Sequence, residues 1–248
     1  MCRHVAYLGP PRPLADLLFT PSHGLVHQSW APREMRGGGT INADGFGLGW
    51  YPDADRAPVS YRQAGPIWSD PNLPGLATTI TSAAVLGAVR SATVGMPVTA
   101  GAAAPFRDGP WLFSHNGVVR GWPETVATLA ERLPVTELLT LEAATDSALL
   151  WALVRQHLRA GARLGEALSD TIRDVRREAP ESRLNLLLTD GHRVAATTVG
   201  HSLWLRQGNG CLQIASEPLD DDPEWRPVPD GQLVLASTTH LDITELNT

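Results

Sequence analysis

The order of strand-like and helix-like segments along this chain restricts its fold more than any other feature. Short runs with β character, many of them bounded by Gly, Pro or Asp, lie towards the two ends, at residues 2–8, 46–51, 83–90, 110–114, 184–189, 193–199, 211–216 and 232–236. Between them, apolar residues recur at helical spacing over 146–159 and 163–178, and 123–132 predicts a helix that stops before Pro134. Because strands and helices do not alternate regularly, a parallel doubly wound sheet is not expected. The pattern predicts a mixed α+β fold with largely antiparallel sheets.

Composition excludes several classes of protein. The chain has 248 residues, a net charge of −6 and scattered basic residues, so it shows no footprint for nucleic acid. Its cysteines, Cys2 and Cys211, give no disulfide framework and no metal-binding spacing. No signal peptide pattern and no apolar run of membrane-spanning length are present. We therefore expect a single domain over residues 2–248, located in the cytoplasm, with no metal, cofactor, nucleic-acid or membrane partner.

Cys2 is the first candidate for chemistry, because only Met1 precedes it. Removal of Met1 would leave a free α-amine and a thiol on one residue, and the unprotonated amine can accept the thiol proton. Cys2 could equally be a small buried hydrophobe. A strand over residues 2–8 would also place His4 on the same face as Cys2, as an alternative base. The residues alone leave these three interpretations open.

Asn116 and Gly117 follow an apolar run and also have two interpretations. Asn-Gly is the favoured pair of a two-residue hairpin loop. The same pair can form an oxyanion hole, in which the Asn amide and the Gly N–H converge on a developing negative charge.

Arg90 and Asp146 are charged residues at the ends of predicted elements. Arg90 would ordinarily be a solvated surface charge, but its planar guanidinium also suits bidentate binding of a carboxylate. Asp146 lies in the sequence Thr-Asp-Ser that opens the predicted helix, where each of the three residue types is a favoured N-cap. Its carboxylate could instead face a substrate ammonium group.

Two glycine-containing segments are informative about structure. Residues 42–51 alternate Gly with Phe, Leu and Trp but lack the Gly-Lys-Ser/Thr of a phosphate-binding loop. They predict a strand that another backbone approaches closely. Asp190-Gly191, between two predicted strands, predicts a β-hairpin.

Together and in this order, Cys2, residues 42–51, Arg90 with Thr93, Asn116-Gly117 and Asp146 resemble the class II glutamine amidotransferases, a family of N-terminal-nucleophile hydrolases. The resemblance spans essentially the whole chain. Within the family it is strongest to the ergothioneine-pathway branch that hydrolyses γ-glutamyl-hercynylcysteine sulfoxide, through residues 1–9, 88–97 and 215–225. It implies a four-layer αββα sandwich of two mainly antiparallel sheets between helices. A homodimer is compatible with it.

The resemblance also implies roles for these residues. Cys2 would attack the γ-carbonyl of a small γ-glutamyl substrate, and Asn116 and Gly117 would hold the oxyanion. Arg90, with Thr93, would bind the glutamyl α-carboxylate, and Asp146 its α-ammonium. A leaving group that carries a trimethylammonium would suit aromatic and acidic side chains, for which the candidates are Trp30, Asp44, Phe46 and Trp50. The alternatives are a glutaminase subunit that supplies ammonia to a separate synthetase, and a non-catalytic binding module.

Overall fold

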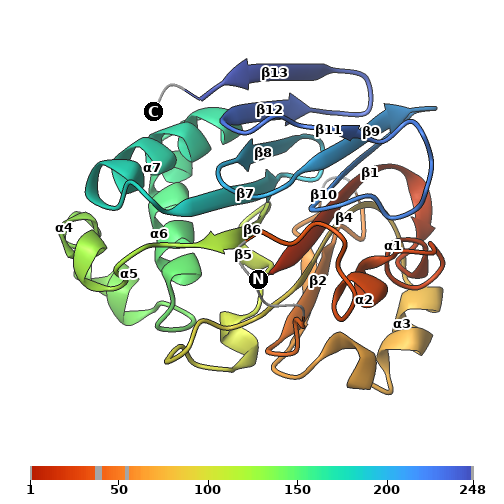
Figure 1. The fold of residues 1–248 in the computed structure, drawn as a ribbon, viewed down its shortest axis with the longest axis horizontal. Helices are drawn as coiled ribbons and strands as arrows, with labels where there is room; N and C mark the ends of the chain where they lie inside the picture. Colours follow the sequence, from red (N-terminus) through yellow and green to blue (C-terminus); the bar gives the residue numbers. More distant parts are fainter. Residues whose placement is uncertain (1, 37–40, 54–55, 247–248) are drawn as a thin grey trace.

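The computed structural model describes residues 2–36, 41–53 and 56–246, and it contains two antiparallel sheets (Figure 1). Sheet A has the strand order β11-β9-β10-β1-β4-β2-β3 and sheet B the order β13-β12-β8-β7-β6-β5. The strands of sheet A are β1 (Arg3–Pro13), β2 (Phe46–Trp50), β3 (Val59–Gln63), β4 (Thr81–Val89), β9 (Trp204–Gly208), β10 (Cys211–Ala215) and β11 (Arg226–Pro227). Those of sheet B are β5 (Phe106–Asp108), β6 (Trp111–Val118), β7 (Arg183–Thr189), β8 (Val194–Thr198), β12 (Gln232–Ala236) and β13 (Leu241–Glu245).

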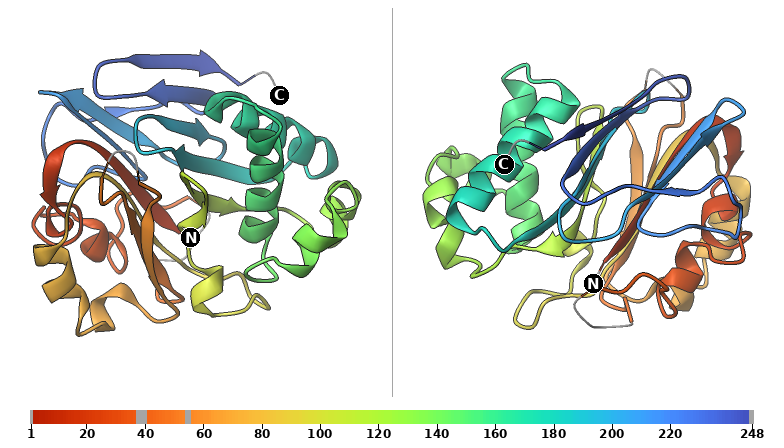
Figure 2. Two further views of the ribbon diagram at one scale, coloured as in Figure 1. Left: turned by 180° about the vertical axis from the view of Figure 1, so that it is seen from behind. Right: turned by 45° about the horizontal axis from the view of Figure 1, so that its top comes forward.

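Helices cover the outer faces of both sheets (Figure 2). On sheet A lie the short helices α1 (Ala15–Leu18), α2 (Leu25–Gln28) and α3 (Leu73–Thr79). On sheet B lie α6 (Asp146–Arg159) and α7 (Leu164–Glu178), with α4 (Ala127–Ala130) and α5 (Val135–Leu139) beside them. Single 3₁₀ turns are η1 (Ile67–Ser69), η2 (Ala100–Ala102) and η3 (Glu124–Val126). None of the described helices is long and apolar enough to cross a membrane.

Three apolar cores separate these four layers, which confirms the predicted αββα sandwich. Successive side chains of a strand point to opposite faces of its sheet. On β1, Val5 and Tyr7 pack towards α1–α3, whereas Ala6 and Leu8 pack against sheet B. Even-numbered residues at the start of the chain, including Cys2, therefore belong to the face between the sheets.

The glycines of β2 explain how closely the two sheets approach. A Cβ at Gly47 would overlap the Ala104 carbonyl group, and one at Gly49 would lie 2.7 Å from a Leu112 methyl group. The predicted close approach of another backbone is confirmed. Because these glycines face sheet B, the aromatic residues that alternate with them face the outer helices.

The long elements match their sequence predictions better than the short ones. Helix α6 covers 146–159 as predicted and α7 begins one residue later than predicted, at Leu164. The predicted helix over 123–132 is instead η3 followed by the single turn of α4. The hairpin at Asp190-Gly191 joins β7 to β8, with Gly191 at φ +88°. Strands β3, β5, β9, β11 and β13 were not predicted, nor were α1, α2, α3 and α5.

Candidate active site

Cys2 lies immediately before β1 and opens onto a small cavity of about 20 Å³, about the space of one water molecule. Its side chain is half-buried, and its Sγ lies 3.9 Å from the Ser91 carbonyl oxygen. The cavity is lined by Cys2, Ala88, Val89, Arg90, Ala102, Ala104, Phe106, Ser114, His115 and Ser147. The structure therefore brings the N-terminal cysteine, the end of β4, strand β6 and the start of α6 to one place. Met1, whose removal was predicted, lies outside the described residues.

A buried ionic cluster fixes the backbone beside Cys2. Arg3 is fully buried and its Nη1 donates to the Cys2 carbonyl oxygen at 3.3 Å. Its Nε lies 3.9 Å from Glu217 Oε1, which is 3.0 Å from His23 Nε2. Glu217 Oε2 also accepts the backbone N–H of Glu34 at 2.6 Å. Burial raises the pKa of Glu217, but the His23 hydrogen bond and the Arg3 charge outweigh burial and leave it lowered.

Arg90 is 8% exposed, so the interpretation as a solvated surface charge is wrong. Its Nη1 donates to the carbonyl oxygens of Pro97 at 2.9 Å and Asp44 at 3.3 Å. No hydrogen bond joins its Nε or Nη2 to the part of the chain that the structure describes, so one edge of the guanidinium is free. The Asp44 carboxylate accepts the Ala92 N–H at 2.8 Å and so holds the arginine segment in place. Thr93 is exposed on the following loop and does not line the cavity.

Asn116 and Gly117 lie within β6, opposite Asn185 and Leu184 of β7, so the interpretation as a hairpin turn is wrong. Asn116 is fully buried, and its Nδ2 donates to Ser216 Oγ at 3.3 Å. Ser216 Oγ also accepts the backbone N–H of His4 at 3.0 Å. The hydroxyl of Ser216 thus connects the candidate oxyanion residue to the strand that carries Cys2.

The surroundings of His4 argue against a role as the base. Its Nδ1 lies 3.2 Å from Ser114 Oγ and its ring is fully buried. Burial first, and then the charges of His115 and Arg3, lower the pKa of His4 to about 3. The imidazole is therefore neutral at physiological pH and takes up a proton poorly. His201, buried and near the same histidine and arginine, also has its pKa lowered to about 3, mainly by burial.

Asp146 begins α6 but is not its N-cap, because Thr145 accepts the Ala148 N–H at 3.2 Å in that role. Asp146 Oδ2 accepts the Val119 N–H at 3.0 Å and Oδ1 accepts the Ser147 N–H at 2.7 Å. These bonds hold a carboxylate that is 5% exposed. It directly precedes Ser147, which lines the cavity.

The structure does not bring the predicted aromatic residues to Cys2. Phe46 is 1% exposed in the core beneath the outer helices, and Trp50 packs against the same core. Both face away from sheet B. Trp30 is 44% exposed and forms an edge-to-face pair with Trp68 at 5.8 Å. Of the four candidates for the leaving-group pocket, Asp44 is the one that forms hydrogen bonds with Arg90 and Ala92.

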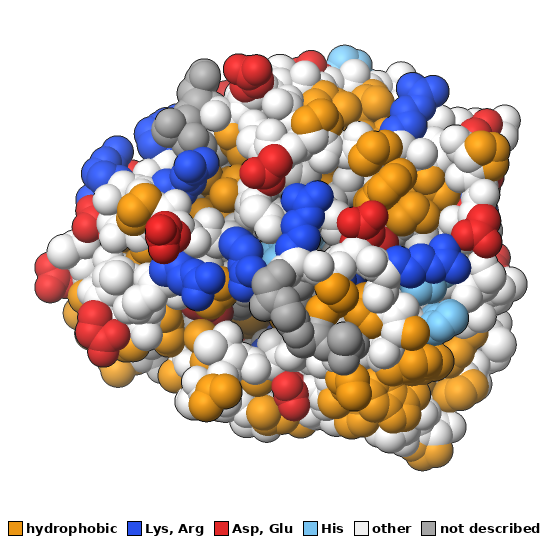
Figure 3. All heavy atoms as spheres, in the orientation of Figure 1, with side chains coloured by type: hydrophobic (Ala, Val, Ile, Leu, Met, Phe, Trp, Pro, Cys, Tyr) orange, Lys and Arg blue, Asp and Glu red, His pale blue; other side chains and the backbone are white. Residues whose placement is uncertain are grey.

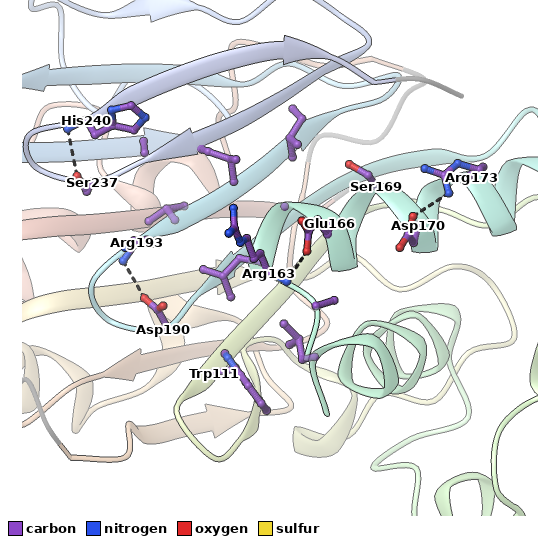
Figure 4. Close-up of a pocket in the computed structure, with 18 of the residues that line it drawn as sticks. Trp111, Arg163, Glu166, Ser169, Asp170, Arg173, Asp190, Arg193, Ser237 and His240 are labelled. Atoms are coloured by element: carbon purple, nitrogen blue, oxygen red, sulfur yellow. Dashed lines mark hydrogen bonds and ion pairs between the residues drawn. The ribbon is translucent and has the colours of Figure 1, made fainter. Parts of the chain in front are cut away.

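A larger groove of about 1010 Å³ lies between α7, β8 and β12, and no cysteine lines it (Figure 4). The acidic side chains in it are engaged locally: Glu166 accepts the Arg163 N–H, Asp170 pairs with Arg173, and Asp190 accepts the Arg193 N–H. Among the described residues, no group of three or more His, Cys, Asp or Glu could hold a metal ion. The cavity at Cys2, unlike the groove, carries a thiol and the buried Arg90, so it is the better candidate for an active site.

Basic side chains gather near the middle of the face shown in Figure 3, although the chain as a whole is acidic. Burial, and then the positive charge of Arg120, lower the pKa of Arg183.

Sequence reasoning missed His115, Ser147 and Ser216 as site residues. Alternation along β6 could have indicated that His115 and Asn116 point to opposite faces.

Comparison with known proteins decides the family. The model of the family described as glutamine amidotransferases class-II matches residues 25–208. The chain belongs to this family. It is 43% identical over 247 residues to the gamma-glutamyl-hercynylcysteine sulfoxide hydrolase of Mycolicibacterium smegmatis, covering 99% of this chain and 100% of that protein. It is 40% identical to the protein of the same name in Mycobacterium tuberculosis, covering 100% of this chain and 97% of that protein.

Solved structures share the fold. A class II domain protein from Silicibacter pomeroyi is 25% identical, with a TM-score of 0.68 and full coverage of both chains. Glutamine phosphoribosylpyrophosphate amidotransferase from B. subtilis matches 99% of this chain with 49% of its own, at 15% identity and a TM-score of 0.70. The second likeness concerns the fold alone, and it confirms the predicted arrangement of two antiparallel sheets with helices.

Proposed function

We propose that this protein hydrolyses the γ-glutamyl amide bond of γ-glutamyl-hercynylcysteine sulfoxide through a thioester on Cys2. The products would be glutamate and hercynylcysteine sulfoxide, in the cytoplasmic synthesis of ergothioneine. One observation carries the proposal: the 43% identity with a hydrolase of that name extends over both whole chains. The cavity that joins Cys2 to Arg90 and to the start of α6 supports it.

Cys2 would supply both nucleophile and base after removal of Met1. The α-amine accepts the thiol proton, and the thiolate attacks the γ-carbonyl carbon to give a tetrahedral oxyanion. The α-ammonium then returns the proton to the leaving nitrogen as the C–N bond breaks. Water attacks the thioester, again with the α-amine as base, and releases glutamate and the thiol.

Asn116 would stabilise the oxyanion together with the Gly117 N–H. In the present amide orientation Ser216 Oγ accepts from both His4 N–H and Asn116 Nδ2, while Asn116 Oδ1 has no partner among the described residues. Turning the amide over lets the Ser216 hydroxyl donate to Oδ1 and frees Nδ2 for the oxyanion. This orientation gives the His4 N–H, the Ser216 hydroxyl and Asn116 Oδ1 each a hydrogen-bond partner. An oxyanion donor of this kind contributes about 3 kcal/mol to catalysis.

Arg90 and Asp146 would recognise the glutamyl end. The free edge of the Arg90 guanidinium can donate two hydrogen bonds to a carboxylate in bidentate geometry. Asp146 has both oxygens held by backbone N–H groups and retains lone pairs for an α-ammonium. An amide that lacks either group would leave a buried charge unpaired, so it should be rejected strongly.

The test compares wild type with Cys2→Ala and, as a matched control, Cys211→Ala, the other cysteine of the chain. Intact mass first establishes that Met1 is absent. We expect the sulfoxide conjugate to be cleaved by wild type and Cys211→Ala but not by Cys2→Ala, and a diazoketone analogue of glutamine to label Cys2. Activity in Cys2→Ala would refute the nucleophile. Turnover of L-glutamine at a comparable rate would favour the glutaminase alternative.

We also infer that residues 2–248 form one domain. A homodimer is compatible with the family resemblance, and sedimentation of the purified protein decides between one chain and two: a species of about 26.6 kDa, the mass of one chain, would exclude the dimer.

A further inference from the structure

A chain of hydrogen bonds joins β6 to the candidate ammonium-binding carboxylate. His115 Nε2 lies 3.0 Å from the Arg183 carbonyl oxygen, and its Nδ1 lies 2.9 Å from Ser147 Oγ. Ser147 Oγ is in turn 3.3 Å from Asp146 Oδ1. The imidazole is 3% exposed and lines the cavity at Cys2.

The direction of these bonds in neutral His115 follows from the groups present. A carbonyl oxygen can only accept, so Nε2 carries the proton and Nδ1 must accept. Its donor is the Ser147 hydroxyl, which has one proton to give. Asp146 Oδ1 then receives the Ser147 N–H alone, and one lone pair on each carboxylate oxygen stays available to a ligand.

Protonation of His115 reverses the chain. Nδ1–H now donates to Ser147 Oγ, and the hydroxyl proton turns to Asp146 Oδ1. The carboxylate loses a site for a ligand, and a positive charge appears beside the position of a bound ammonium. Both changes oppose cation binding.

We propose that His115 is a positioning residue that controls, through Ser147, how strongly Asp146 binds the α-ammonium of the substrate, and that its protonation weakens this binding. The proposal rests on the function proposed above, which places that ammonium at Asp146. Neutral His115 is the binding state, so the affinity for γ-glutamyl substrates falls as the pH falls.

Other titratable or charged groups lie on the elements around His115. They are Asp146 on α6, Arg183 on β7, His4 and Arg3 on β1, Cys2 and Arg90 at the cavity, and His201 after β8. His4 and His201, with pKa values lowered to about 3 by burial, stay neutral above pH 5. The arginines stay charged. The protonation of Asp146 itself and of the Cys2 α-amine must therefore be separated from that of His115.

The experiment measures kcat and KM for the sulfoxide conjugate between about pH 5 and 8.5. Wild type is compared with His115→Gln, whose amide can still donate to the Arg183 carbonyl, and with Ser147→Ala. The matched control is His192→Gln, which lies exposed on the β7–β8 turn. A glutaryl amide without the α-ammonium is included as a competitive inhibitor.

We expect the KM of wild type and His192→Gln to rise about tenfold in acid, that of His115→Gln to stay flat, and that of Ser147→Ala to rise less. The inhibition constant of the glutaryl amide should not rise. If KM still rises in acid in His115→Gln, the rise comes from protonation of Asp146 and the inference is overturned. An equal rise for the glutaryl amide would overturn it too. Equal affinity of the glutaryl and glutamyl amides at pH 8.5 would instead refute the ammonium role of Asp146, while hydrolysis by Cys2 would stand.

Discussion

Gly117→Ala tests how tightly the two central strands of sheet B are packed at the site. A Cβ at position 117 would lie 2.6 Å from the Arg183 carbonyl carbon and 2.5 Å from His115 Nε2. Ordinary carbon–carbon contacts are about 3.5–4.0 Å, so β6 and β7 would have to separate by about 1 Å. Overpacking of this kind costs about 1–3 kcal/mol, and a broken His115–Arg183 hydrogen bond adds about 1–3 kcal/mol.

We expect Gly117→Ala to lower the free energy of unfolding by about 3 kcal/mol and the Tm by about 6–12 °C in a chain of this size. Urea unfolding followed by circular dichroism measures the change. The control is Gly75→Ala: Gly75 is exposed in α3, an added Cβ would meet no group within 4 Å beyond the helix's own backbone, and alanine should stabilise the helix slightly. A loss below about 1 kcal/mol in Gly117→Ala would refute the steric argument.

Two further predictions concern buried charges. Arg90→Lys should lower kcat/KM for γ-glutamyl substrates about 100-fold, because lysine cannot keep the Pro97 bond and also bind a carboxylate in bidentate fashion. Steady-state kinetics measure the change. An unchanged kcat/KM would refute the binding of the α-carboxylate by Arg90. Glu217→Gln should cost about 3 kcal/mol at pH 7, because it leaves Arg3 buried without its counterion. Since the folded-state pKa of Glu217 is lowered, wild type loses this stabilisation as the pH falls below about 4.3. The difference in urea midpoint between wild type and Glu217→Gln should therefore become smaller in acid. A constant difference, or an equal loss in the exposed control Glu224→Gln, would contradict it.

The fold was predictable where side-chain periodicity extends over many residues. Helix α6 has a continuous apolar stripe and its bounds agree with the prediction. Strand β11 has two residues and α1 has four, which is too short for a period to emerge. Asn116-Gly117 was ambiguous because a hairpin loop and a strand interior can carry the same pair, and the pairing with β7 decides between them.

Sequence analysis could single out candidate site residues where the side chain has unusual chemistry for its position. Cys2 and Arg90 are two such residues, and both line one cavity. Phe46 and Trp50 were chosen as aromatic residues near a glycine-rich strand, but sequence could not tell which face of β2 turns towards Cys2. Glu217 lay in a segment that supported the resemblance, yet its contact with Arg3 spans 214 positions of the chain and has no local signal.

That long-range contact has a consequence for the order of events in the cell. Strand β1 is synthesised long before its partner β10 and before Glu217, the counterion of Arg3. Until Glu217 has been made, Arg3 lacks this counterion. Once Glu217 is in place, Arg3 can be buried beside it and hold the Cys2 carbonyl oxygen. A chain that ends before residue 217 should therefore lack the ionic cluster that fixes the backbone beside Cys2.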